Sequence, residues 1–116
     1  MQTNHSKTSI IIHFVFVTKF RHELIWTDHM LELMKGIIEK IGCQVLELNS
    51  AGNHVHAIID MHPSITISDF ACKVKSCSSG AFKKFYNNWE SWQTGYFACS
   101  VGSESINKVR EYIRNQ

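Results

Sequence analysis

The segment between Ile10 and Val17 restricts the fold of this chain more than any other. It reads Ile-Ile-Ile-His-Phe-Val-Phe-Val, so nearly every side chain is apolar and most are β-branched or aromatic. Continuous apolarity of this kind is typical of a strand inside a sheet, because an edge or half-exposed strand alternates apolar with polar residues. The segment therefore predicts a central strand within residues 8–19.

Apolar residues recur at helical spacing in two long segments and one short one. The first, residues 27–42, begins at Thr27, whose hydroxyl can cap a helix, and ends at Gly42, a residue typical of helix ends. The second covers residues 66–85. A short last helix is predicted for residues 103–115, with Ser103 as its cap.

Three further strands lie between these helices. We predict them at residues 43–48, at the apolar run that begins with His54, and at residues 96–101. The order β-α-β-β-α-β, followed by a helix, is the ferredoxin-like split β-α-β arrangement. We therefore expect one α+β domain, residues 1–116. It would have a four-stranded antiparallel sheet with two helices on one face, and the other face would be open unless something else covers it.

The composition excludes several classes of protein. Of the 116 residues, 44% are apolar and 19% are charged, which is typical of a folded domain. No segment has the apolar length of a membrane span, and the polar first residues do not resemble a secretion signal. We therefore expect a cytoplasmic protein with no membrane partner. The four cysteines lack zinc-finger spacing and are expected to be free thiols.

The net charge of +2 is compatible with nucleic-acid binding but does not identify it. Basic residues gather in two places. Lys19 and Arg21 follow the first strand, and a second group lies in the second long helix: Lys73, Lys75, Lys83 and Lys84. A solvated protein surface explains such charges as well as a DNA partner does.

His54-Val55-His56 places two imidazoles two residues apart on a predicted strand. Because side chains alternate along a strand, both histidines point to one face and Val55 points to the other. Two imidazoles side by side on a rigid strand are half of a metal site. His13 of the first strand could approach this site, although a buried, hydrogen-bonded histidine is the simpler interpretation.

Tyr112 occupies the flank of the predicted last helix. The apolar stripe of that helix is formed by Ile106, Val109 and Ile113. At about 100° per residue, Tyr112 lies to the side of the stripe, and Gln116 follows one turn later on the same side. One interpretation is an edge tyrosine that packs its ring. The other is a nucleophile beside a metal ligand.

Taken in order, these segments resemble a known family. His54-Val55-His56 and the C-terminal Tyr112-Ile113-Arg114-Asn115-Gln116 are similar to the motifs of the single-tyrosine HUH transposases of small insertion sequences, the IS200-like or TnpA-like family. Residues 14–21, the segment Lys75-Ser76-Cys77-Ser78-Ser79, and residues 92–102 resemble further family segments. The likeness extends over almost the whole chain.

The resemblance implies a transposase that cleaves and transfers DNA strands. His54, His56 and Gln116 would bind a divalent metal, Mg²⁺ or Mn²⁺. Tyr112 would attack a phosphodiester to leave a 5′-phosphotyrosine bond and a free 3′ hydroxyl. The substrate would be single-stranded DNA with hairpins at the element ends, and the enzyme would be a homodimer that can exchange its C-terminal helix. Contacts with DNA are expected from Lys19, Arg21, Lys73, Lys75, Ser78, Ser79 and Lys83.

Two other functions remain open on the sequence. A related HUH nuclease that processes repeats or starts replication would nick DNA without strand transfer. A non-catalytic ferredoxin-like nucleic-acid-binding module would use the histidines structurally, since this fold hosts many functions. Formation of a covalent protein–DNA adduct separates either enzyme from the binding module.

Overall fold

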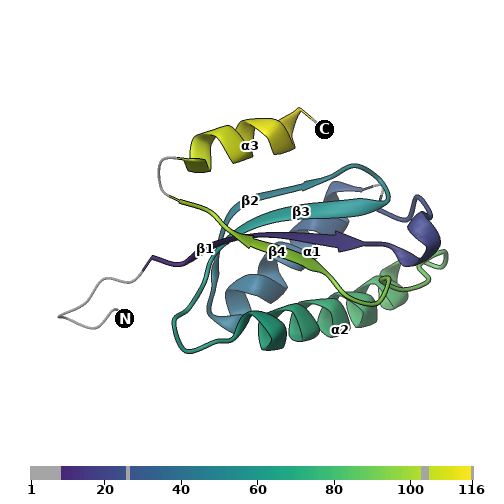
Figure 1. Ribbon diagram of the computed structural model, residues 1–116. Helices are drawn as coiled ribbons and strands as arrows, with labels where there is room; N and C mark the ends of the chain where they lie inside the picture. The colour runs from purple at the N-terminus through teal and green to yellow at the C-terminus, as the bar shows by residue number, and fades with distance from the viewer. Residues whose placement is uncertain (1–8, 26, 103–104, 116) are drawn as a thin grey trace.

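The four strands form one antiparallel sheet in the order β2-β3-β1-β4. A computed structural model describes residues 9–25, 27–102 and 105–115 of the chain. Its elements are β1 (Ile11–Val17), η1 (Lys19–Arg21), α1 (Asp28–Ile41), β2 (Gln44–Ser50), β3 (His54–Asp60), α2 (Ile67–Phe85), β4 (Phe97–Ser100) and α3 (Ile106–Arg114). β1 lies inside the sheet, as its continuous apolarity predicts. The ferredoxin-like α+β fold is confirmed (Figure 1).

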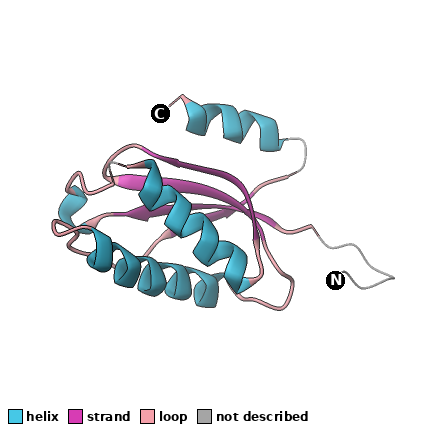
Figure 2. Cartoon of the chain, turned by 180° about the vertical axis from the view of Figure 1, so that it is seen from behind, coloured by secondary structure: helices cyan, strands magenta, loops and turns pink. Residues whose placement is uncertain are grey.

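Helices α1 and α2 cover one face of the sheet, and the main core lies between these two layers (Figure 2). Phe14 and Phe16 of β1 point into this core and are fully buried. The ring of Phe14 lies 4.8 Å from that of Phe70 on α2, measured between centroids. None of the helices that the structure describes is long and apolar enough to cross a bilayer.

Helix α1 begins and ends at the predicted capping residues, and α2 begins at a threonine cap that was not predicted. The hydroxyl of Thr27 accepts the backbone N–H of Met30, and Gly42 ends α1 with a φ of 106°, a left-handed conformation that favours glycine. The hydroxyl of Thr66 accepts the N–H of Asp69 in the same way at the start of α2. These local signals explain why both helices were predictable.

Some boundaries differ from the prediction. β1 ends at Val17 instead of continuing to Lys19, because the chain enters the tight turn η1 immediately after Thr18. β2 runs on to Ser50, and β4 is shorter than the predicted 96–101. The predicted cap of the last helix, Ser103, lies outside the described residues, and α3 begins at Ile106.

Helix α3 covers part of the second face of the sheet, opposite α1 and α2 (Figure 1). Ile113 of α3 is fully buried in a small apolar cluster with Ile11 of β1 and Ile58 of β3. Phe97 of β4 remains 54% exposed. The second face is therefore neither fully open nor fully covered, and its remaining part is accessible beside α3.

Polar contacts fix α3 to β2. The carboxylate of Glu47 accepts hydrogen bonds from the guanidinium groups of Arg110 and Arg114 at 3.0 to 3.3 Å. The side-chain amide of Asn49 donates to the carbonyl oxygen of Ile113 at 2.8 Å. These bonds set where the flank of α3, which carries Tyr112, lies over the sheet.

Candidate active site

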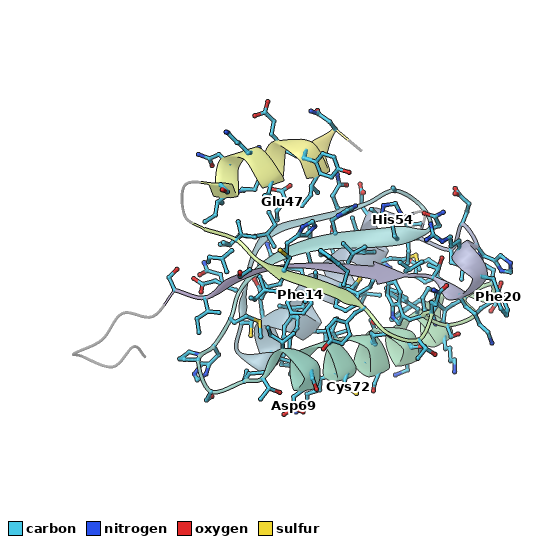
Figure 3. All side chains as sticks on the ribbon, in the orientation of Figure 1. Phe14, Phe20, Glu47, His54, Asp69 and Cys72 are labelled. Carbon is cyan, nitrogen blue, oxygen red and sulfur yellow. The ribbon has the colours of Figure 1, made fainter. Side chains whose placement is uncertain are left out.

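An open pocket of about 390 Å³ lies between α3 and the accessible part of the sheet. It is lined by Val15, Val17, Arg21, His54, His56 and Tyr112. The pocket therefore combines two predicted metal ligands, the predicted nucleophile and one predicted DNA contact. His54 stands on this side of β3, toward α3 (Figure 3).

His54 and His56 share one face of β3, as strand alternation predicts. Their ring centroids are 4.8 Å apart, while Val55 is fully buried on the opposite face. His54 Nδ1 lies 2.7 Å from the side-chain oxygen of Asn53. Because an amide oxygen only accepts, Nδ1 carries the proton and the lone pair of a neutral ring is on Nε2. This is the tautomer that a metal-binding imidazole needs when Nε2 is the ligand.

His56 is hydrogen-bonded to His13, with 3.0 Å between His56 Nδ1 and His13 Nε2. The two rings stack with centroids 5.2 Å apart. In the register of the sheet, Val15 of β1 pairs with His56, so His13 is a diagonal neighbour. Burial lowers the pKa of His13 below its ordinary value, which favours a neutral ring whose Nε2 can accept a hydrogen bond from His56. The sequence indicated that His13 could approach the site or be a hydrogen-bonded histidine, and the structure shows that its partner is His56.

Tyr112 projects from the flank of α3, as predicted, and its side chain is 61% exposed. Its ring lies 6.3 Å from the ring of His56, nearly perpendicular to it. Gln116, the predicted third metal ligand, lies outside the described residues. Within residues 9–25, 27–102 and 105–115, no three His, Cys, Asp or Glu side chains gather as a metal site. Metal binding by His54, His56 and Gln116 therefore stays a prediction.

The predicted DNA contacts fall into different places. Arg21 lines the pocket, and Lys19 stands next to it in η1. Lys73 and Lys83 are exposed on α2, which covers the opposite face of the sheet (Figure 2). Of these four, Arg21 shares the pocket with the histidine pair. The contacts of Lys73 and Lys83 with DNA stay a prediction.

The Lys-x-x-Ser-Ser segment of α2 makes contacts inside the fold. Lys75 Nζ donates to the carbonyl oxygens of Gln93 and Gly95, each at 2.7 Å. The hydroxyls of this segment accept indole N–H groups at 2.9 Å: Ser78, which is fully buried, from Trp92, and Ser79 from Trp89. These three side chains fasten the loop before β4 to α2, and their contacts with DNA stay a prediction.

The sequence of this chain also matches a known protein family. Residues 6–116, nearly the entire chain, match the family described as "Transposase IS200 like". The chain belongs to the IS200-like transposase family. The predicted family is thereby confirmed, and the protein is a transposase by membership of that family.

Individual relatives agree with this membership. The IS200 transposase of Salmonella typhimurium is 25% identical over 122 residues, which cover 97% of this chain and 80% of that protein. The ISDra2 transposase TnpA of Deinococcus radiodurans is 21% identical, over 90% of this chain and 81% of its own length.

Two solved structures share the fold of this IS200-like chain. A protein of Deinococcus radiodurans solved as a candidate transposase superposes with a TM-score of 0.77 and 21% identity, covering 100% of this chain and 97% of that one. A REP-associated tyrosine transposase bound to a REP hairpin superposes with a TM-score of 0.68 and 15% identity, covering 97% of this chain and 68% of that one.

Proposed function

We propose that this IS200-like transposase cleaves and transfers single-stranded DNA by covalent catalysis, with Tyr112 as the nucleophile. The observation that carries the proposal is one pocket lined by Tyr112, His54, His56 and Arg21. A phenol can attack phosphorus, paired imidazoles can hold a cation, and a guanidinium can bind a phosphate oxygen. These are the groups that breaking a phosphodiester by covalent catalysis requires.

The reaction follows from these groups. The hydroxyl oxygen of Tyr112 forms a bond to phosphorus and loses its proton, while the bond from phosphorus to the 3′ oxygen breaks and that oxygen takes up a proton. The products are a 5′-phosphotyrosine bond and a free 3′ hydroxyl. A 3′ hydroxyl of another strand can then attack the same phosphorus and release Tyr112. Because the covalent bond conserves the free energy of the phosphodiester, no nucleotide cofactor is needed.

The histidine pair fits a divalent cation, Mg²⁺ or Mn²⁺. The two rings lie on one face, and the hydrogen bond from His54 to Asn53 directs the Nε2 lone pair away from the turn. We propose Gln116 as the third ligand from the protein. When bound, such a cation would withdraw charge from the phosphate oxygens and orient the phosphate. His13 and Asn53 would orient the two imidazoles.

The partners are proposed on the same basis. The REP-associated relative is bound to a DNA hairpin, which supports hairpins at the insertion-sequence ends as the substrate of this chain. We also propose a cytoplasmic homodimer. Here Tyr112 lies beside His56 of its own chain, and exchange of α3 between subunits would bring Tyr112 to the partner's histidines instead.

The test is a covalent trapping assay. Single-stranded DNA from both flanks of the gene, labelled at its 3′ end, is incubated with the protein and Mn²⁺ and separated on a denaturing gel. We expect a labelled protein–DNA adduct that Tyr112→Phe and a chelator abolish and that Tyr96→Phe leaves intact. Nicking without strand transfer would favour the repeat-processing or replication nuclease. DNA binding without an adduct in any divalent metal would favour the binding module.

A further inference from the structure

Phe20 is exposed in a strained turn next to the pocket. With 72% of its surface exposed, it is the most exposed large apolar residue that the structure describes. Its φ is 55°, and that of Arg21 is 57°. Left-handed backbone is unfavourable for residues with a Cβ atom, and two consecutive such residues are rare outside glycine and asparagine. Neither the exposure nor the strain helps folding.

The surrounding structure holds this turn in place. The buried hydroxyl of Thr18 donates to the carbonyl oxygen of His22 at 2.6 Å and lies 2.9 Å from that of Asn53. The backbone N–H of Thr18 also donates to Asn53, and that of Lys19 donates to Ser91. Since Asn53 bonds to His54, the turn is tied to the histidine strand. A strained conformation that its neighbours enforce indicates a functional role.

The two neighbours of Phe20 in the chain are cationic, and one of them lies against the exposed ring. Lys19 Nζ lies 5.4 Å from the ring centroid of Phe20, and Arg21 lines the pocket with Tyr112. The ring projects outward from η1 (Figure 3). An apolar protein partner would not favour a ring with a lysine ammonium group beside it. A ligand with flat unpaired bases and negatively charged phosphates suits both features.

We propose that Phe20 stacks on an unpaired base of the single-stranded DNA, next to the nucleotide whose phosphate enters the pocket. Lys19 and Arg21 contact the adjoining phosphates. Because every base has an aromatic face, this stacking positions the strand without reading its sequence. Phe20 is therefore a positioning residue. The proposal rests on the proposed function for the identity of the ligand.

A protein–DNA mutant cycle tests the stacking. Fluorescence anisotropy measures binding of a labelled single-stranded oligonucleotide from the gene's flank, in which an abasic site is moved one position at a time. We expect wild-type affinity to fall about 5- to 100-fold at one position. Phe20→Ala should lose a similar factor on the intact oligonucleotide and become insensitive to that abasic site. Phe20→Tyr should bind like the wild type.

Two further variants separate stacking from folding. Phe20→Asn removes the ring but suits a left-handed backbone, so it should lose the same affinity while its melting temperature is unchanged or higher. Phe85→Ala is the matched control, because Phe85 is a 58% exposed phenylalanine of α2 that does not line the pocket. It should bind DNA normally.

The outcomes distinguish the two proposals. The stacking would be overturned if Phe20→Ala and Phe20→Asn bound DNA with wild-type affinity. It would also be overturned if the abasic site weakened binding equally in the wild type and in the variants. If the abasic effect depends on Phe20 but the wild type never forms an adduct, the stacking stands and Tyr112 catalysis fails. If the adduct forms and no position depends on Phe20, Tyr112 catalysis stands and the stacking fails.

Discussion

His13 Nε2 and His56 Nδ1 lie 3.0 Å apart, which connects the central strand to the histidine pair. The contact fixes the orientation of the His56 ring and, where His56 donates, leaves its Nε2 with a lone pair for a metal. His54 has an equivalent partner in Asn53. Both proposed ligands are thus oriented by a neighbour within the fold.

Loss of the His13 contact should weaken metal binding. We expect His13→Ala to lower the affinity for Mn²⁺ about 10- to 100-fold, since removal of a group that orients a ligand has effects of this size. Calorimetric titration with Mn²⁺ measures it without DNA. His13→Gln, which can still hydrogen-bond to His56, should recover part of the loss. The exposed His62→Ala is the control, and equal Mn²⁺ affinity in His13→Ala and His62→Ala would contradict the role of His13.

Removal of both ligands should abolish the reaction. We expect His54→Ala combined with His56→Ala to eliminate adduct formation at any Mn²⁺ concentration, while the circular dichroism spectrum stays that of the wild type. Both side chains line the pocket on the face away from the main core, so the fold does not depend on them. Cleavage that persists in the double variant would show that these histidines do not hold the metal.

Glu47 should control how firmly α3 docks. Glu47→Gln weakens the bonds to Arg110 and Arg114, so we expect a loss of about 1 kcal/mol from docking of the helix. Amide hydrogen exchange in α3 should then rise about fivefold, and adduct formation should slow. Glu39→Gln, on the exposed side of α1, should change neither. Unchanged exchange in α3 would mean that the apolar cluster around Ile113 and the remaining hydrogen bonds hold the helix without Glu47.

Lys75 should affect stability more than DNA binding. Its ammonium group donates to two backbone carbonyls of the loop before β4, so Lys75→Met should lower the free energy of unfolding by about 1.5–3 kcal/mol. Lys73→Met, exposed on the same helix, should leave stability unchanged. Urea unfolding measures both variants. A Lys75→Met protein that is as stable as the wild type but fails to bind DNA would indicate that Lys75 contacts DNA.

The cysteines should react at two different rates. Cys43 is buried, and burial raises its pKa, so less of it is thiolate at a given pH. Cys72, Cys77 and Cys99 are exposed. With a disulfide reagent at pH 8 under native conditions, we expect three fast thiols and one slow one, and four fast thiols in denaturant. Fast labelling of Cys43 in the native protein would contradict the packing of β2 against α1.

The sequence predicted the parts of this molecule that depend on local pattern. The apolar run of β1, the caps Thr27 and Gly42 of α1, and the alternation that places His54 and His56 together are all encoded within a few neighbouring residues. Tyr112 was assigned to a helix flank for the same reason, and its 61% exposure agrees.

What the sequence did not predict depends on contacts between distant segments. The pairing of His13 with His56 follows from the register of β1 and β3, which no single strand specifies. The bonds of Lys75 to the carbonyls of Gln93 and Gly95 were not predicted, because those residues belong to a loop that only the fold brings near. The left-handed backbone of Phe20 is enforced by Thr18 and its neighbours, not by the residue's own preference.

The proposed function depends on a covalent bond between Tyr112 and DNA. The most direct measurement is mass spectrometry of the adduct formed with Mn²⁺ after nuclease and trypsin digestion. We expect a nucleotide remnant on the peptide Glu111-Tyr112-Ile113-Arg114. A remnant on the peptide of Tyr86 or Tyr96, or no linked peptide although the DNA is bound, would contradict it.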